Sequence, residues 1–315
     1  EAIRLAVVCE DAARAVDPRI VNSEGASLSS HFGVQVYGNS HGFIGGYPST
    51  RHGLSCAVIG QDGESMQRDY WWTSARSAAD LEDPEAVGRR AAERTLARLG
   101  ARQIPTCQAP VVFRAEVATG LLRNLTGAIN GTSLYRRASF LLDHLGERIF
   151  PEFVRIYEDP HLLRGLSSAP FDGEGVATAA KDFVSGGVLR SYVLDTYSGC
   201  RLGMPTTGNA GGVRNLHVAM GLLDLPGLLR EMGTGLLVTE LMGSGINPVT
   251  GDYSRGAAGF WVEGGEIAFP VEEITIAGNL KRMYQGLVAV GNDCDFPGST
   301  RTGSWFIDEM TIAGQ

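Results

Sequence analysis

Short stretches in which apolar and polar residues alternate fill the chain between residues 21 and 74. They include residues 34–37, 43–45, 54–59 and 66–72, and they are separated by Gly, Asn and Asp, as in Gly60-Gln61-Asp62-Gly63. A two-residue period between turns of this composition is typical of antiparallel hairpins. The sequence therefore predicts short paired strands over this region.

A period of about four residues marks the predicted helices. Asp83 suits an N-cap, Pro84 a first helical position and Gly100 a helix end. Between them one face carries Val87, Ala91, Thr95 and Leu99. Similar patterns predict helices over residues 2–16, 117–128, 133–145, 225–232 and 278–288. Gly120 and Gly127 interrupt the second of these, and each costs a helix about 1 kcal/mol unless close packing needs it.

The second half returns to strands punctuated by Gly. They are predicted over residues 110–113, 153–157, 183–194, 234–241, 256–262, 266–269 and 274–276. Because strands and helices do not alternate as βαβ units, the predicted fold class is α+β, with largely antiparallel sheets and a few packed helices. Glycine accounts for 42 of 315 residues, which indicates many turns.

The length predicts about two domains. Residues 1–105 would hold the end of an N-terminal domain and a hairpin-rich connection with one helix, and residues 106–315 would form a C-terminal α+β domain. The chain does not start with Met and opens inside an apolar segment. We therefore expect that a further N-terminal portion belongs before it.

The charge of the chain excludes some classes of partner. A net charge of −8 and a pI near 5.3 argue against a nucleic-acid groove, which needs a dense basic face. No apolar run reaches the ~20 residues that cross a bilayer, and no signal peptide is visible. Five cysteines without a CxxC pair encode neither a disulfide framework nor a zinc knuckle, so we expect a cytoplasmic protein with no membrane contact.

Few residues indicate chemistry by themselves. His41 and His52 flank a predicted hairpin and could face each other across it, and His31 lies nearby. A hydrolytic or metal site assembled from these three histidines is one alternative. Gly243-Ser244-Gly245 lacks the full GxSxG frame of a nucleophile elbow. No GxxxxGK[ST] or GxGxxG segment opens a helix, so nucleotide binding is not indicated.

The last third of the chain carries a family resemblance. The segments that carry it are EMGTGLLVTELMG at residues 231–243, TGDYSRGAAGFWVE at 250–263, EITIAGNL at 273–280, VGND at 290–293 and MTIAGQ at 310–315. Together they resemble the TldE (PmbA) branch of the TldD/PmbA family, and residues 106–315 resemble its C-terminal domain. The resemblance implies a cytoplasmic protein, named a modulator of DNA gyrase, that forms a heterodimeric metalloprotease with a TldD-like subunit. Unfolded peptides, including microcin leader sequences and a toxin's antidote, would be its substrates.

The resemblance also implies where a metal would be held in the other branch of the family. There an HExxxH helix and a distant Cys bind the metal, and the Glu serves as the general base. The alignment places Arg114 and Thr119 at the two His positions and Ala115 at the Glu position, and residues 298–304 contain no Cys. Arg cannot release its proton to bind a cation, and a lone Thr hydroxyl is a poor zinc donor.

We therefore expect no catalytic residue and no metal in this chain, and zinc in the TldD-like partner. Glu116 stands one residue late and would point about 100° away on a helix, so it does not inherit the role of the base. The apolar spacing favours a packing role for this helix. Arg114, Glu116 and Thr119 are the candidates for contact with peptide or partner.

Three hypotheses remain open at this point. In the first, the chain is the metal-free subunit of a heterodimeric peptidase, and an extended peptide pairs with an exposed strand edge. In the second, it is a self-sufficient hydrolase that uses His31, His41 or His52. In the third, it is a regulatory protein that binds gyrase without proteolysis. A homodimer of the isolated chain is open in each case.

Overall fold

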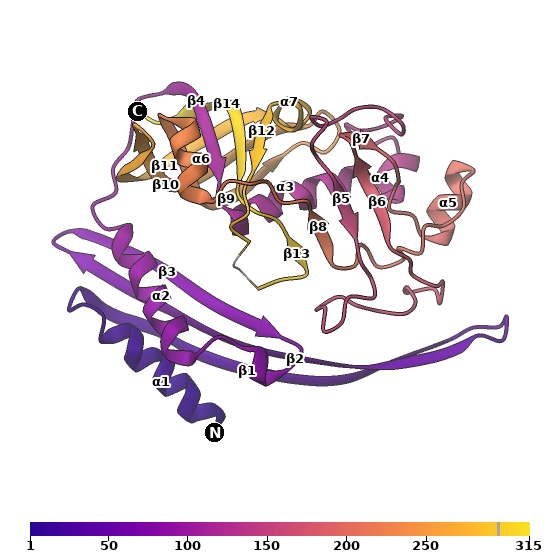
Figure 1. Cartoon of the computed structure of the whole chain (residues 1–315), viewed down its shortest axis with the longest axis horizontal. Coiled ribbons are helices and arrows are strands. Elements are labelled where there is room, and N and C mark those ends of the chain that lie inside the picture. The colour runs from indigo at the N-terminus through magenta and orange to yellow at the C-terminus, as the bar shows by residue number, and fades with distance from the viewer. Residues whose placement is uncertain (295–296) are drawn as a thin grey trace. The chain divides into compact units, whose positions relative to one another are not determined.

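The computed structural model describes residues 1–294 and 297–315. These residues form two units (Figure 1). Unit 1 holds residues 1–36, 46–102 and 297–298, and unit 2 holds the other described residues. The α+β class predicted from the sequence is confirmed, since helices pack on sheets whose pairings are mostly antiparallel.

Three strands form the sheet of unit 1, in the order β1 (Ile20–Gly38), β2 (Ile44–Asp62) and β3 (Ser65–Ala75). The register of β2 and β3 runs without a break from His52 opposite Ala75 to Asp62 opposite Ser65. The predicted hairpins are therefore present, but the prediction of short strands is wrong. β1 and β2 each span 19 residues, because the polar and glycine positions that suggested turns are accommodated within the ladder.

Two helices accompany this sheet, α1 (Ala2–Arg14) and α2 (Pro84–Ala97), with a short 3₁₀ turn at Ala78–Asp80. The Asp83 side chain caps α2 by accepting hydrogen bonds from the backbone N–H groups of Glu85 and Ala86, as predicted. Gly88 permits the close approach of the two helices. A Cβ atom there would lie 2.0 Å from the carbonyl oxygen of Cys9, so a larger residue would force the helices apart.

The main sheet of unit 2 has the order β11-β10-β9-β4-β14-β12. Its strands are β4 (Cys107–Phe113), β9 (Gly235–Ile246), β10 (Asp252–Glu263), β11 (Glu266–Asn279), β12 (Leu287–Val290) and β14 (Trp305–Ala313). Only the pairing of β4 with β9 is parallel among the pairings of this sheet that the structure describes. β14 also pairs with β11, with Ile276 opposite Ile312, so the sheet curls until these strands meet.

Alternation along β4 places helices on both faces of this sheet. Val111 and Phe113 belong to the large core, together with Leu121 of α3 (Ala115–Ala128). Val112 belongs to a smaller cluster with Leu228 of α6 (Leu225–Met232). The two-residue period of the strand therefore directs successive side chains to different helices.

A second sheet in unit 2 has the order β13-β8-β5-β6-β7 and shares the large core. Its strands are β5 (Ile156–Glu158), β6 (Lys181–Ser185), β7 (Val188–Leu189), β8 (Leu216–Val218) and β13 (Thr300–Arg301). The remaining helices of the unit are α4 (Gly131–Tyr135), α5 (Thr196–Leu202) and α7 (Leu280–Gln285). Long connections join these short elements.

Several predicted boundaries are corrected by the structure. The helix predicted over residues 133–145 is wrong, since only the five residues of α4 are helical. Arg137 and Asp143 adopt positive φ values of 55° and 62°, which end helical geometry. The helix predicted over 278–288 is only α7. The strands predicted at 266–269 and 274–276 are one strand, β11, whose pairing with β10 is interrupted by register shifts.

Other predictions hold more closely. α6 has the predicted bounds, and Asp224 caps it by accepting a hydrogen bond from the N–H of Gly227. The apolar stripe predicted over 117–128 lies in α3, whose buried residues include Leu121, Leu125 and Ala128. Within residues 1–294 and 297–315, none of the helices combines the length and the apolar character that a bilayer crossing requires.

Candidate functional site

The start of α3 lies at the end of a central strand. Arg114 directly follows Phe113, the last residue of β4, and its backbone N–H donates to the carbonyl of Val238 in β9 at 3.0 Å. Arg114 is the N-cap residue, and the helix begins at Ala115. The residue aligned with the first metal-binding His therefore stands just outside the helix rather than in its first turn.

The three predicted contact residues meet one another at this position. Arg114 Nε lies 3.5 Å from Glu116 Oε1, and the side chains are 27% and 10% exposed. The hydroxyl of Thr119 donates to the carbonyl oxygen of Glu116 at 2.7 Å. The cation is thus paired with a carboxylate, and the Thr119 proton is directed back into its own helix. Contact of these residues with a peptide or a partner remains a prediction.

The donor chemistry here does not fit a zinc ion. Arg114 is cationic and Ala115, which is buried, has no donor atom. Across residues 1–294 and 297–315, no group of three or more His, Cys, Asp and Glu side chains is placed so that it could hold a metal ion.

The segment aligned with the distant ligand Cys is tightly packed. Asp293 Oδ1 accepts from the N–H of Ser304 at 2.8 Å, and Oδ2 accepts from its hydroxyl at 2.6 Å. A Cβ atom on Gly303 would lie 2.0 Å from the carbonyl oxygen of Gly291. Ser304 is fully buried. The Asp293 carboxylate thus holds Ser304, the residue before β14, by two hydrogen bonds.

The strand β9, which contacts the start of α3 at Val238, continues as an exposed strand edge. β4 pairs with β9 only from Leu236 to Val238, and β9 continues to Ile246 with β10 as its one partner strand in the part of the chain that the structure describes. Residues 242–245 of this extension are exposed. Backbone groups along such an edge can accept an added strand.

β9 carries a bulge near this edge, and its neighbour β10 carries a buried tyrosine. Gly243 has φ 73°, in the register shift where Ser254 pairs with Gly245 and Gly256 with Met242. Tyr253 is buried, and its hydroxyl has no hydrogen-bond partner among the described residues. Burial raises the pKa of Tyr253 to about 12, although the nearby Arg255 guanidinium opposes the shift.

The three histidines of the hydrolase hypothesis lie on the hairpin of β1 and β2. His52 Nδ1 lies 2.9 Å from the hydroxyl of Ser30 on β1. His41 lies in the turn, where its N–H donates to Asn39 Oδ1. His52 is eight residues beyond the start of β2, about 27 Å along the strand. The expectation that His41 and His52 face each other is therefore wrong.

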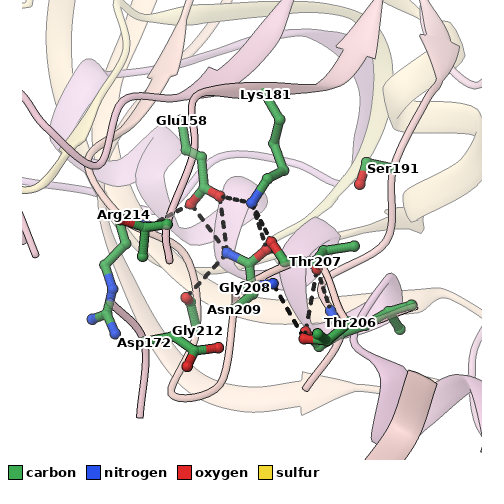
Figure 2. Close-up of polar contacts among 12 residues, drawn as sticks. Glu158, Asp172, Lys181, Ser191, Thr206, Thr207, Gly208, Asn209, Gly212 and Arg214 are labelled. Atoms are coloured by element: carbon green, nitrogen blue, oxygen red, sulfur yellow. Dashed lines mark hydrogen bonds and ion pairs between the residues drawn. The ribbon is translucent and has the colours of Figure 1, made fainter. Parts of the chain in front are cut away.

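A buried polar cluster that sequence reasoning missed lies in unit 2 (Figure 2). It consists of Glu158, Asp172, Lys181, Thr207 and Asn209. Glu158 is 1% exposed. Its Oε1 accepts from Lys181 Nζ at 2.7 Å and from Asn209 Nδ2 at 2.9 Å. Its Oε2 accepts from the backbone N–H of Arg214 at 2.7 Å.

This cluster fixes the Gly-rich loop, residues 206–215, to two strands. Glu158 ends β5 and pairs across the sheet with Lys181, the first residue of β6. Lys181 Nζ also donates to Asn209 Oδ1 at 3.0 Å and to the Thr207 carbonyl. The hydrogen bonds of Lys181 and Glu158 are charge-assisted, and Glu158 is buried. Such bonds stabilise one conformation of the loop.

Asp172 anchors the same loop from another side. Its Oδ1 accepts from the N–H groups of Glu174 and Val176, and its Oδ2 accepts from the N–H of Ala210 at 2.9 Å. Asp172 is 2% exposed. Three backbone donors thus satisfy a carboxylate that has no cation in contact with it among the described residues.

Two signals in the sequence could have pointed to the cluster. The chain contains 25 arginines but only two lysines, Lys181 and Lys281. Gly208, Gly211 and Gly212 also concentrate in one short segment. Neither signal identifies Glu158 or Asp172, because they are distant from the loop in the sequence.

Comparison with known proteins agrees with this architecture. Residues 1–99 match the PmbA/TldA metallopeptidase central domain, and residues 106–314 match the PmbA/TldA metallopeptidase C-terminal domain. The chain is 54% identical over 315 residues to a protein of Escherichia coli O157:H7 named metalloprotease PmbA. That match covers all of this chain and 70% of the relative.

Solved structures share the fold. A candidate modulator of DNA gyrase from Bacteroides thetaiotaomicron has a TM-score of 0.94 at 32% identity, over 100% of this chain and 71% of that one. TldE from Thermococcus kodakarensis has a TM-score of 0.86 at 23% identity, over 99% of this chain and 74% of that one, and at this identity the likeness carries the fold alone. From the two domain matches and the sequence identity, the chain belongs to the PmbA/TldD family of metallopeptidases.

Proposed function

We propose that this chain is the TldE-like, metal-free subunit of a heterodimeric peptidase, and that a TldD-like subunit supplies the zinc and the catalysis. The observation that carries the proposal is the start of α3. The fold of the family is present there, but Arg114, Ala115 and Thr119 supply no metal ligand. The Arg114 and Glu116 pair instead presents a polar surface that can contact the partner or the peptide.

In this proposal the chain contributes the scaffold and part of the peptide-binding surface. Unfolded peptides pair with the exposed edge of β9 at residues 243–245, on the part of the strand that continues beyond Val238, which accepts from the Arg114 N–H. Main-chain hydrogen bonds give affinity that depends little on sequence, as degradation of varied unfolded peptides requires.

The decisive experiment compares the full-length protein, a TldD-type subunit and their mixture. We expect peptide cleavage and about one zinc per heterodimer only when the TldD-type subunit is present, with cleavage increased by this chain. Elemental analysis that finds stoichiometric zinc in this chain alone would contradict the proposal. Cleavage by this chain alone, lost on His52→Ala, would favour the self-sufficient hydrolase instead.

A second candidate function is regulation of gyrase without proteolysis. It is supported by the name of the Bacteroides thetaiotaomicron relative, a candidate modulator of DNA gyrase. Affinity capture with this chain that recovers gyrase but no TldD-like subunit would favour it. We propose a cytoplasmic location in either case, since the cysteines are unpaired in the structure and thiols persist in reducing compartments.

A further inference from the structure

We propose that Arg214 of the Gly-rich loop binds a carboxylate group of the peptide, either an acidic side chain or the C-terminal carboxylate. This inference rests on the proposed function and adds the chemical class of one substrate group.

The guanidinium of Arg214 has no partner in the part of the chain that the structure describes. Among the described residues, its buried Nε makes no hydrogen bond and no carboxylate lies within ion-pair distance of it. The residue as a whole is half-buried. A partly dehydrated cation without a partner is unfavourable, and an incoming anion would relieve that cost.

The backbone around Arg214 is held from both sides. The Arg214 N–H donates to Glu158 at 2.7 Å. The next residue, Asn215, is 2% exposed and adopts a left-handed φ of 40°. Its Nδ2 donates to the carbonyl of Asp159 and to the hydroxyl of Ser168, each at 2.8 Å. The backbone of Arg214 is thus held in one position before any ligand binds, which lowers the entropic cost of binding.

Nη2, a terminal nitrogen of the Arg214 guanidinium, lies near the backbone of Gly211, which has no side chain. A Cβ atom on Gly211 would be 3.7 Å from Arg214 Nη2, and Gly211 itself is exposed. Figure 2 shows the Arg214 side chain directed away from Glu158 and Lys181. Glycine at this position therefore leaves one side of the guanidinium unshielded by a side chain.

Among the described residues, the carboxylates of Glu158 and Asp172 make no contact with the Arg214 guanidinium. Glu158 is satisfied by Lys181, Asn209 and the Arg214 backbone, and Asp172 by three backbone N–H groups. The planar guanidinium can form two parallel hydrogen bonds with a carboxylate. A carboxylate is thus the group that fits it, and a peptide offers one in acidic side chains and at its C-terminus.

The test measures peptide affinity of the heterodimer after zinc removal by a chelator, so that nothing is cleaved. Fluorescence anisotropy would compare a peptide containing one Glu with its Gln analogue, each with a free or an amidated C-terminus. We expect at least a tenfold preference for the peptide that carries the recognised carboxylate. Arg214→Gln should abolish the preference and Arg214→Lys should keep part of it. The exposed Arg230→Gln is the matched control and should change nothing.

The outcomes separate the two proposals. If the wild-type heterodimer binds the peptides and Arg214→Gln keeps the same preference, the Arg214 inference is overturned. The same holds if that variant lowers the melting temperature and leaves the preference unchanged, which would make Arg214 a long-range counter-ion of Glu158 and Asp172. If the heterodimer binds no better than its TldD-type subunit alone, the proposed function fails.

In that last case the inference is tested on this chain alone. The Nε–H resonance of Arg214, assigned by its loss in Arg214→Gln, should shift with saturation on titration with a short Glu-containing peptide. The amidated Gln analogue should produce no shift. Equal responses to both peptides would overturn the inference.

Discussion

The start of α3 and the buried polar cluster differ in how strongly the fold constrains them. At the start of α3, Arg114 is 27% exposed and its ion pair with Glu116 is 3.5 Å long. In the cluster, Glu158 is 1% exposed and accepts short hydrogen bonds from Lys181, Asn209 and the backbone of Arg214. The position that resemblance links to metal chemistry is thus lightly held here, whereas the Gly-rich loop is held by many directed contacts.

The difference indicates which region has to be rigid in this chain. A surface that contacts a partner can keep side chains with few internal contacts, because the partner supplies the rest. A loop that must present one side chain in a fixed direction needs buried anchors on several sides. We therefore expect substitutions in the cluster to affect folding and substitutions at the start of α3 to affect assembly or peptide cleavage.

The largest effect is expected for Glu158→Ala. Removing one partner of a buried ion pair leaves the other charge unpaired, which typically costs about 3–5 kcal/mol. The free energy of unfolding, measured with urea, should fall by that amount, and the Gly-rich loop should become susceptible to proteolysis. Glu147→Ala is the matched control, since the side chain of Glu147 is 63% exposed. A loss below about 1 kcal/mol would remove the contrast between the two regions.

The buried hydroxyl of Tyr253, which has no hydrogen-bond partner among the described residues, is expected to make the stability of the chain depend on pH. Its pKa is about 12 in the folded chain and about 10 when unfolded. The protonated form is therefore favoured by folding, and this contribution is complete below pH 10 and lost as the pH rises toward 12. Tyr253 should contribute about −1.4 kcal/mol per pH unit to the slope of the free energy of unfolding in this window.

The Tyr253→Phe variant should flatten that slope. At pH 7 it should be as stable as the wild type or more stable by about 1 kcal/mol, because the deleted hydroxyl has no partner. Urea unfolding of both proteins from pH 9 to pH 12 makes the measurement. An unchanged slope would show that other groups control stability at alkaline pH.

Gly120→Ala should stabilise the chain by about 0.5–1 kcal/mol. Gly120 lies inside α3, and a Cβ atom there would meet nothing within 4 Å among the described residues. Close packing within the chain therefore does not explain this glycine. Thermal unfolding of the isolated chain measures the gain, and Gly131→Ala is the contrasting variant, since its Cβ would lie 2.2 Å from the hydroxyl oxygen of Ser198. Destabilisation by Gly120→Ala would show that α3 is constrained as tightly as the cluster.

The smallest effect on stability is expected for Arg114→Ala. An ion pair this long and partly exposed is worth less than about 1 kcal/mol, so the free energy of unfolding should change by no more than that. If Arg114 contacts the partner or the peptide, cleavage by the heterodimer should fall while folding stays intact. A change of several kcal/mol without an effect on cleavage would assign Arg114 to packing.

Local sequence features predicted the elements whose causes are local. Asp83 and Asp224 cap α2 and α6 as their positions indicate, and the spacing of Leu121 and Leu125 identifies the buried face of α3. The prediction failed where distant segments decide the backbone. The helix expected over 133–145 breaks at Arg137, and the hydroxyl of Ser139 donates instead to the carbonyl of Ala128.

The candidate site divides in the same way. The alignment that the family resemblance supplied named Arg114, Glu116 and Thr119 as contact candidates, and the structure brings them together at the start of α3. The sequence could not identify the buried polar cluster, whose hydrogen bonds join β5, β6 and the Gly-rich loop. Each of those residue types is ordinary on a protein surface, and only burial makes their pairing costly to break.

By itself, the sequence predicted the α+β fold class from the spacing of residue types, and its resemblance in the last third of the chain identified the family. Tertiary structure alone decided that β1 and β2 are single long strands and, among the described residues, that β9 extends beyond its pairing with β4 and that the Arg214 guanidinium has no partner. These properties depend on which segments of the chain meet and on how much water they exclude. The spacing of residues along the sequence encodes neither.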